Sequence, residues 1–240
     1  CDGSFQFGDR IFGCWYTKGH GEIDLSSAIS SSCDIYFYKT IKYYDFDKLS
    51  SFYKMFGFGA RTGVDIQGES QGVVPTIDYM NKRYGRSGWS KGSLLNYCIG
   101  QGELLVTPMQ VFNYTNLLAT KGNTYNPHFV KNNARYQSDS IKISNDIWNR
   151  ITMDMNKVIT DEKGTGKAAD PLIPNAKIFG KTGTAENPHG EDHAWFIGWM
   201  EFFEKCYSVV VLLENSGSGG SVAAPIAKNI FEKIILSSGR

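Results

Sequence analysis

Residues 179–186 read FGKTGTAE and residues 193–199 read HAWFIGW, and these two stretches decide the fold. Within and beside them, residues 177–179, KIF, and 194–199, AWFIGW, predict two strands, and residues 207–213, YSVVVLL, predict a third. We expect the three strands in meander order, as an antiparallel sheet. Regularly spaced apolar residues over 226–235 predict a helix after the meander.

Before the meander the sequence favours helices. Asp24 is placed to cap a helix that runs to about Ser31, and Ile35–Tyr38 begins another. Three further helices are expected, over residues 47–57, with Asp47 as its cap, 107–122 and 144–160.

Two regions lack a clear hydrophobic period. Residues 1–21 are rich in glycine and aromatic residues and predict an ordered loop, whereas residues 59–102 predict loops and short strands. Helices followed by an antiparallel sheet indicate an α+β fold. With 240 residues, 41% of them hydrophobic, the chain can bury one sizeable core, so we expect a single domain over residues 1–240.

The overall composition argues against several functions. The 25 Lys and Arg balance 24 Asp and Glu, and no basic stripe stands out, which argues against nucleic-acid binding. No apolar run reaches the ~20 residues of a membrane span, and the first residues do not read as a signal peptide. Since residue 1 is Cys rather than Met, we interpret the sequence as the middle of a longer protein.

Lys181-Thr182-Gly183-Thr184 lies at the end of the first predicted strand, where these residue types have a definite chemical use. The ammonium of Lys181 supplies positive potential and the Thr182 hydroxyl can hold a carboxylate. Gly183 lets the backbone of a substrate approach closely.

Together these stretches resemble the penicillin-binding proteins, whose third motif region is similar to residues 179–186 followed by His193–Phe196. Residues 19–21, Gly-His-Gly, and residues 32–38, SCDIYFY, resemble the elongation-type subfamily of penicillin-binding protein 2. Other similar stretches are residues 99–102, 106–110, 209–214 and 219–225.

The resemblance implies the transpeptidase fold shared with serine β-lactamases, an antiparallel sheet flanked by helices, here lacking its N-terminal strands and nucleophile helix. The family's second motif, Ser-x-Asn, matches Ser32-Cys33-Asp34. It implies that Ser32 relays protons near the leaving amine and that Asp34 lines the cleft. The Asp departs from the general pattern but resembles what is usual in the elongation-type subfamily, and a carboxylate near Lys181 would favour the charged ammonium.

The activity that the resemblance implies is peptidoglycan D,D-transpeptidation on stem peptides ending in D-Ala-D-Ala, with β-lactams as mimics of that end. Thr182 and Thr184 would bind the terminal carboxylate, with Lys181 supplying charge. The backbone N–H of Thr184 would form half of the oxyanion hole. No organic cofactor is implied.

The family's first motif, Ser-x-x-Lys, supplies the acylated serine and should lie several dozen residues before Ser32. The sequence contains one match, Ser51-Phe52-Tyr53-Lys54, but it follows the second motif. Phe52 and Tyr53 also read as the buried face of a helix. We therefore interpret Ser51 as unrelated to catalysis and expect the nucleophile outside this chain, which alone should be inactive.

Three of the five cysteines and one histidine gather in the first 33 residues: Cys1, Cys14, His20 and Cys33. Three Cys and one His are a standard tetrahedral set for structural zinc, and the pattern resembles a zinc site of some elongation-type members. The alternative is a disulfide between Cys1 and Cys14 that leaves Cys33 free, as an oxidising periplasm would favour.

The resemblance favours an enzyme of cell-wall elongation whose parent is anchored in the inner membrane, with this domain in the periplasm and membrane proteins of the elongation complex as partners. A β-lactam sensor or a non-catalytic module that binds stem peptides would share the same motifs. A zinc-dependent interaction domain is a third hypothesis, and the Lys-Thr-Gly strand argues against it.

Overall fold

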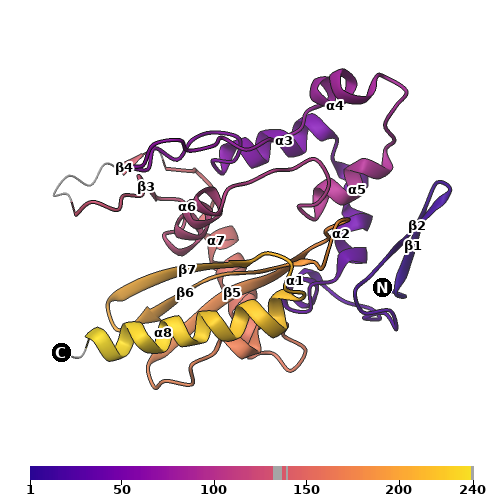
Figure 1. Ribbon diagram of the computed structural model, residues 1–240. Helices are drawn as coiled ribbons and strands as arrows, with labels where there is room; N and C mark the ends of the chain where they lie inside the picture. The colour runs from indigo at the N-terminus through magenta and orange to yellow at the C-terminus, as the bar shows by residue number, and fades with distance from the viewer. Residues whose placement is uncertain (132–136, 139, 239–240) are drawn as a thin grey trace. The chain divides into compact units, whose positions relative to one another are not determined.

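The computed structural model describes residues 1–131, 137–138 and 140–238 of the chain (Figure 1). The chain forms two compact units. The first consists of Cys1–Ala28, Ser32–Thr62 and Ile66–Thr107, and the second of Ile29–Ser31, Gly63–Asp65 and Pro108–Arg240. That residues 1–240 form one domain stays a prediction.

A three-stranded sheet is the centre of the second unit. Its strands β5 (Ala176–Ala185), β6 (His193–Phe202) and β7 (Lys205–Leu213) are antiparallel neighbours in the order β5-β6-β7. The predicted meander is therefore confirmed. Thr182 pairs with Phe196 and Thr184 with Ala194, so the Lys-Thr-Gly-Thr residues continue β5 beyond its apolar part.

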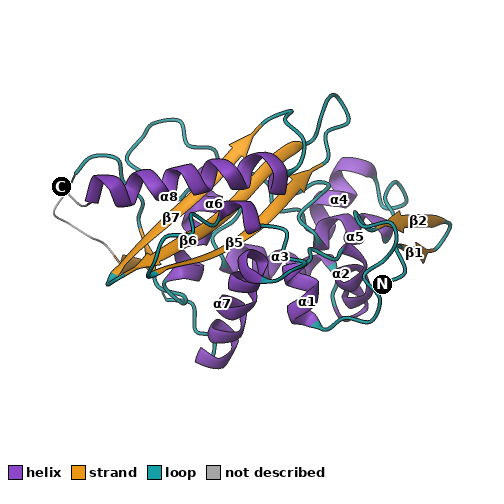
Figure 2. Ribbon diagram, turned by 90° about the horizontal axis from the view of Figure 1, so that it is seen from below, coloured by secondary structure: helices purple, strands orange, loops and turns teal. Residues whose placement is uncertain are grey.

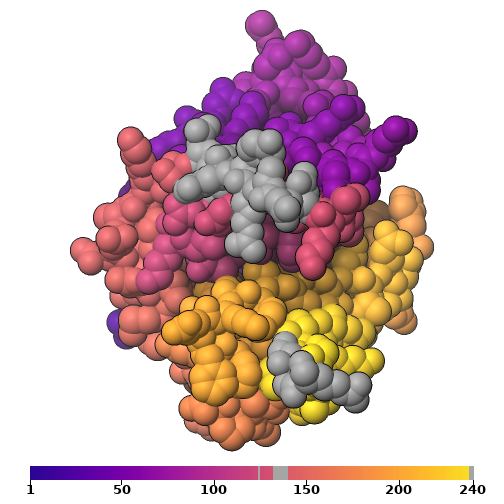
Figure 3. Space-filling view, turned by 90° about the vertical axis from the view of Figure 1, so that its left-hand side faces the viewer, coloured from indigo at the N-terminus to yellow at the C-terminus, as the bar shows by residue number. Residues whose placement is uncertain are grey.

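Helices cover both faces of this sheet. Helix α8 (Ala224–Ser238) lies along one face and α6 (Pro108–Ala119) along the other, while α7 (Asn145–Thr160) packs against β5 (Figures 1 and 2). In the space-filling view of Figure 3, the yellow atoms at the C-terminal end of the chain lie beside the orange atoms of the segment that precedes them. All three helices were expected from the sequence. The remaining elements of this unit are β3 (Thr124–Tyr125), β4 (Gln137–Ser138), η2 (Lys167–Ala169) and η3 (Gly219–Ala223).

Large apolar side chains fix the position of β5 and β6. Phe196 and Met200 of β6 and Phe231 of α8 are all 0% exposed, and each such side chain stabilises the fold by about 1.5–3 kcal/mol. On the other face of the sheet, the rings of Phe179 and Trp199 stack with centroids 4.8 Å apart and planes 8° apart. The strand that carries Lys-Thr-Gly-Thr is thus packed from both sides.

The first unit starts with a hairpin and continues as short helices. Strands β1 (Ser4–Phe7) and β2 (Arg10–Gly13) pair antiparallel, so the expectation of a loop over residues 1–21 is wrong for this part. The helices are α1 (Leu25–Ser30), α2 (Asp34–Thr40), η1 (Ile41–Tyr43), α3 (Phe46–Met55), α4 (Ile77–Tyr84) and α5 (Gly92–Cys98). The last residues of α1 belong to the second unit.

Helices α4 and α5 contradict the expectation of loops and short strands over residues 59–102. Helix α4 is capped by Thr76, whose hydroxyl accepts a hydrogen bond from the Tyr79 N–H at 3.1 Å. The two helices have only 8 and 7 residues, so their periodic signal is weak. Their packing depends on Met80 and Leu95, which are buried against other parts of the unit.

The helix caps agree with the sequence in one case and differ in another. Asp24 accepts from the backbone N–H three residues later at 2.8 Å, which confirms the expected cap. Helix α3 is capped by Asp45 rather than by Asp47, because Asp45 accepts from the Lys48 N–H at 2.8 Å. Asp47 accepts from the Ile77 N–H at 3.0 Å and ties α3 to α4.

Aromatic rings hold α3 and α5 together. Phe46 stacks on Tyr97 with centroids 5.2 Å apart and meets Trp89 edge-on at 5.2 Å. Tyr53 stacks on the same Tyr97 ring at 5.0 Å. Each pair contributes about 0.5–1.5 kcal/mol beyond its area burial, so this aromatic cluster is the second core of the first unit.

Within the described residues, none of the helices combines the length and the apolar character needed to span a membrane.

Candidate active site and metal centre

The Lys-Thr-Gly-Thr residues lie in the second half of β5, an outer strand of the three-stranded sheet. Side chains alternate along a strand, so Thr182 and Thr184 share one face and Lys181 lies on the other. The Lys181 ammonium donates to the Thr182 carbonyl at 3.0 Å. Among the described strands none pairs with the outer edge of β5. Such an edge is where an extended substrate can add to a sheet.

Helix η3 approaches the same residues closely. The Gly219 N–H donates to the Thr184 hydroxyl oxygen at 3.3 Å. A Cβ on Gly219 would lie 2.2 Å from the carbonyl oxygens of both Gly183 and Trp195, so glycine is required here. Helix η3 therefore holds the Thr184 hydroxyl in place.

The Thr182 hydroxyl also has a partner, which the sequence analysis missed. Its Oγ1 lies 2.8 Å from the Oγ1 of Thr165, in the loop between α7 and η2. The Thr165 N–H donates to the Ser30 carbonyl at the end of α1, at 3.1 Å. The signal available in the sequence is a threonine between two glycines, Gly164 and Gly166, which says little by itself.

Ser32 connects α1 to α2 and has a backbone φ of 54°. A left-handed backbone costs a residue other than glycine about 1–2 kcal/mol, and such residues gather at functional sites. The turn leaves Ser32 half-buried and the following Cys33 fully buried. Adjacent side chains of the second motif thus have different surroundings.

Asp34 starts α2 and binds the loop of residues 14–20, here named the metal loop. Its Oδ2 accepts a hydrogen bond from the Trp15 N–H at 3.0 Å. The contact ties the second motif to the segment that carries two predicted metal ligands.

The structure places the predicted catalytic residues in different units. Ser32 and Asp34 belong to the first unit, and Lys181–Thr184 to the second. That Asp34 lies near Lys181 therefore stays a prediction.

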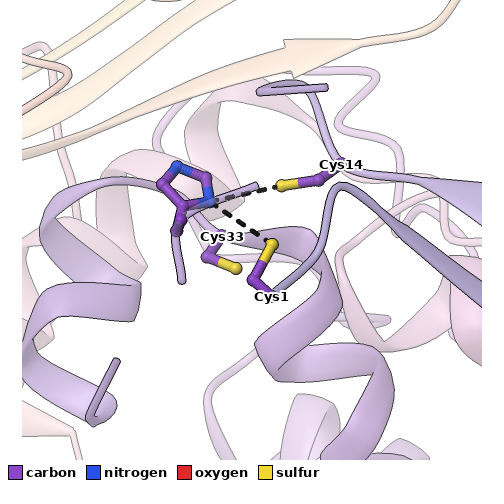
Figure 4. A group of neighbouring side chains, drawn as sticks. Cys1, Cys14 and Cys33 are labelled. Carbon is purple, nitrogen blue, oxygen red and sulfur yellow. Dashed lines mark hydrogen bonds between the residues drawn. The ribbon is translucent and has the colours of Figure 1, made fainter. Parts of the chain in front are cut away.

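Cys1, Cys14, His20 and Cys33 come together within the first unit (Figure 4). Their four ligand atoms all lie within 4.8 Å of one another. The Nδ1 of His20 is 3.6 Å from Cys1 Sγ and 3.5 Å from Cys14 Sγ. Dashed lines in Figure 4 mark these two contacts. Four donors of the types that zinc prefers therefore lie close together.

Two glycines make this arrangement possible. Gly3 has φ +86°, and a Cβ there would lie 2.1 Å from the Thr17 carbonyl oxygen. Gly19 has φ +77°, and its Cβ would lie 2.4 Å from the Cys1 carbonyl oxygen. The segment before β1 and the metal loop can therefore cross in close contact, which brings Cys1 to His20.

Two of the donor distances match those of a zinc site. Bonds of about 2.3 Å to sulfur and about 2.0–2.1 Å to nitrogen give a tetrahedron whose sulfur–nitrogen edge is about 3.5–3.6 Å. The two sulfur–nitrogen distances at His20 are 3.6 and 3.5 Å. All five cysteines are free thiols in this structure, including Cys1 and Cys14.

Burial, and then the neighbouring Cys14, raises the pKa of the Cys33 thiol to about 11. A buried thiolate is costly unless a positive charge lies beside it, and a coordinated cation supplies such a charge. The environment of Cys33 is therefore that of a neutral thiol or of a metal ligand.

The Ser-x-x-Lys match that begins at Ser51 lies on α3. The Ser51 hydroxyl donates to the Lys48 carbonyl one turn earlier at 2.7 Å. The Tyr53 hydroxyl donates to the Tyr97 carbonyl at 2.9 Å, whereas Phe52 is 41% exposed. The expectation that both rings are buried is thus wrong for Phe52. Ser51 bonds within its own helix.

Comparison with known protein families and sequences gives a consistent result. A family model described as "Penicillin binding protein transpeptidase domain" matches residues 2–232. The peptidoglycan D,D-transpeptidase MrdA of Haemophilus influenzae is 33% identical over 93% of this chain and 38% of its own length. The MrdA of Acinetobacter baumannii is 31% identical over 93% of this chain and 36% of its own length. The chain thus spans little more than a third of these relatives.

Solved structures share the fold. The penicillin-binding protein PBP2 from Helicobacter pylori has a TM-score of 0.84 and 31% identity, over 96% of this chain and 44% of that protein. PBP2 of Pseudomonas aeruginosa, solved in complex with WCK 5153, has a TM-score of 0.82 and 31% identity, over 96% of this chain and 52% of that protein. The expected α+β fold, with helices around an antiparallel sheet, is confirmed.

Proposed function

This chain belongs to the family of penicillin-binding protein transpeptidase domains, and we propose that it forms the C-terminal part of an elongation-type peptidoglycan D,D-transpeptidase. One observation carries the proposal. The outer strand β5 presents a lysine and two threonines, and neighbouring groups hold both threonine hydroxyls. A peptide that lies along this edge with a free carboxylate meets hydroxyl donors and a cation.

The proposed substrate is a peptidoglycan stem peptide that ends in D-Ala-D-Ala. A serine of the full-length protein attacks the penultimate carbonyl, the C–N bond breaks, and free D-Ala leaves after its amine takes up the serine proton. The amine of a second stem peptide then attacks the ester, forms the cross-link and returns a proton to the serine. β-Lactams mimic D-Ala-D-Ala and stop at the acyl-enzyme.

Each residue of the two motifs has a role in this proposal. Thr182 and Thr184 bind the terminal carboxylate, and Lys181 supplies positive potential. The Thr184 N–H forms half of the oxyanion hole, a class of contact that changes rates by about 10²–10³. Ser32 relays the proton toward the leaving amine. Asp34 holds the turn that presents Ser32, because its carboxylate accepts a backbone N–H of the metal loop.

We also propose that Cys1, Cys14, His20 and Cys33 hold a structural zinc ion. When bound, zinc supplies a cross-link among the segment before β1, the metal loop and the start of α2. Cys33 lies between Ser32 and Asp34 in the chain, so fixing its side chain also restrains the second motif.

The cellular setting proposed is the periplasmic face of the inner membrane, within the elongation complex. The Helicobacter pylori PBP2 that resembles this chain has been solved in complex with MreC. Another similar structure, with a TM-score of 0.85 and 26% identity, is that of a peptidoglycan synthase complex. We propose that the full-length protein likewise assembles with membrane proteins of cell-wall elongation.

Labelling of the full-length protein with a fluorescent penicillin tests the proposed function. We expect a label that survives denaturation and maps by peptide mass spectrometry to a serine outside residues 1–240. A label on Ser51 would contradict its exclusion, and the absence of any label would contradict the function. Release of D-Ala from a pentapeptide together with cross-linking distinguishes a transpeptidase from a β-lactam sensor, which is acylated but forms no cross-link.

A further inference from the structure

A threonine outside the three family motifs contacts the Lys-Thr-Gly strand. The Oγ1 of Thr165 lies 2.8 Å from the Oγ1 of Thr182 and 3.5 Å from the carbonyl oxygen of Ser30. The Thr165 N–H donates to the same carbonyl at 3.1 Å. Thr165 thus joins β5 to the end of α1, two residues before Ser32 in the chain.

The backbone around Thr165 is held on two sides. A Cβ on Gly164 would lie 2.5 Å from the Val158 carbonyl oxygen of α7, and the Gly166 N–H donates to that carbonyl at 2.9 Å. On the side of η3, a Cβ on Gly220 would lie 2.8 Å from the Thr165 carbonyl oxygen. These close contacts hold the backbone from which the Thr165 side chain extends.

The chemistry of paired hydroxyls then gives Thr165 a role. A threonine hydroxyl has one proton and donates one hydrogen bond, although it can accept others. If Thr182 donates to Thr165, it has no proton left for a ligand carboxylate. We propose that Thr165 is a positioning residue, which donates to Thr182 Oγ1 when an anionic ligand binds and so directs the Thr182 proton to the carboxylate. The proposal rests on the proposed function, which assigns the carboxylate to Thr182.

The Ser30 carbonyl provides the alternative acceptor. At 3.5 Å it lies at the limit of a hydrogen bond, and it accepts the Thr165 proton when Thr182 donates to Thr165. A bound carboxylate reverses the direction in which Thr165 and Thr182 donate, because charge-assisted hydrogen bonds are about twice as strong as neutral ones. The change requires only that two hydroxyl protons rotate, since the heavy atoms are already placed.

The test compares two acylating compounds on the full-length protein: benzylpenicillin and its methyl ester, which lacks the anion. Thr165→Val keeps the shape of the side chain and removes the hydroxyl. We expect it to slow acylation by benzylpenicillin about tenfold, the effect of one hydrogen bond toward a charged group. Acylation by the ester should stay nearly the same. Thr165→Ser keeps a hydroxyl and should retain most of the preference for the acid.

Thr160→Val is the matched control. It removes an exposed hydroxyl of α7 that donates to the Asn156 carbonyl at 3.2 Å, and both acylation rates should stay those of the wild type. The double variant Thr165→Val with Thr182→Val should be no slower than Thr182→Val alone, because Thr165 acts through Thr182.

Several outcomes would overturn the proposal. Equal slowing of acid and ester would show a general distortion of the site, and an unchanged rate with the acid would show that the Thr165 proton has no role. Additive losses of acylation rate in the double variant would show that Thr165 does not act through Thr182. If Thr165→Val does not fold, Thr165→Ala removes the same hydroxyl. It is judged by the same comparison of the acylation rates with benzylpenicillin and with its methyl ester. A wild-type protein that neither compound acylates would refute the proposed function itself, and with it the basis for Thr165.

Discussion

At the scale of single residues, Asp34 stands where the general family pattern has Asn, and its contact gives a physical reason. The carboxylate accepts a hydrogen bond from the Trp15 N–H in the metal loop. A carboxylate is a stronger acceptor than an amide oxygen because the bond is charge-assisted. The second motif and the metal loop are therefore joined by the residue that departs from the pattern.

Replacing Asp34 tests this contact. We expect Asp34→Ala to lower the free energy of unfolding by about 1–2 kcal/mol, because the Trp15 N–H loses its acceptor. Asp34→Asn keeps an acceptor oxygen and should lose less. Urea unfolding measures the change, and Asp9→Ala, at an exposed carboxylate of the same unit, is the control. Equal stability of Asp34→Ala and the wild type would show that the contact contributes nothing.

Lys181 and Lys54 allow a matched comparison of the third motif with the Ser-x-x-Lys match on α3. In the full-length protein we expect Lys181→Ala to slow β-lactam acylation by at least about 2 kcal/mol in transition-state free energy, since a positioned charge is lost. Lys54 is exposed on α3, so Lys54→Ala should acylate like the wild type. Stopped-flow or gel-based acylation rates, with circular dichroism to verify folding, decide the point. Equal rates would refute the assignment of Lys181.

At the scale of elements, the close approach of η3 to β5 determines how the Lys-Thr-Gly strand is supported. Gly219 lies against the backbone of both β5 and β6, and its N–H reaches Thr184. A carbonyl oxygen 2.2 Å from a Cβ cannot be accommodated by a side-chain rotation, because both neighbours are backbone atoms of a paired sheet. Any side chain at this position must therefore push η3 away from β5.

We accordingly expect Gly219→Ala to destabilise the full-length protein by about 1–3 kcal/mol, as overpacking does in a well-packed core. Acylation should slow as well, because the Thr184 hydroxyl loses the Gly219 N–H. Gly13→Ala is the control, since no heavy atom lies within 4 Å of the added methyl. Thermal unfolding and acylation rates are the measurements. A Gly219→Ala protein as stable and as active as Gly13→Ala would contradict the contact.

At the scale of the whole molecule, the proposed metal ligands come from three segments that are distant in the sequence: the chain before β1, the metal loop and the start of α2. Short elements of this kind bury little apolar surface, so a metal cross-link adds to their folding free energy. The hairpin β1–β2 and the second motif depend on the same four side chains.

Metal analysis of the protein purified without added zinc tests the site. We expect about one zinc per chain, and chelation should lower the melting temperature, because binding free energy is folding free energy in such sites. Cys33→Ser should lose the metal and stability, whereas Cys206→Ser, at an exposed thiol of β7, should change neither. Less than about 0.2 zinc per chain, together with a Cys1–Cys14 disulfide by mass spectrometry, would rule the site out.

The sequence by itself determined the features that depend on a regular hydrophobic pattern or on residue type. The three strands of the meander and helices α6, α7 and α8 were predictable because long segments display a regular hydrophobic period. The third motif was recognisable because Lys-Thr-Gly stands within a longer stretch, residues 179–186 followed by His193–Phe196, that resembles the family. The four predicted metal ligands were identifiable as a set, since cysteine and histidine are the donors that zinc prefers.

Only the tertiary structure decided the features that join distant residues. Thr165 and Thr182 are 17 residues apart, Asp34 and Trp15 are 19 apart, and Gly219 and Thr184 are 35 apart. Helices α4 and α5 also depend on packing against other segments rather than on their own few apolar residues. The hydrophobic pattern of one segment indicates which of its residues face the solvent and which face the core. It does not indicate which polar groups will form hydrogen bonds with one another. That pairing is set when packing of the core brings the backbones together.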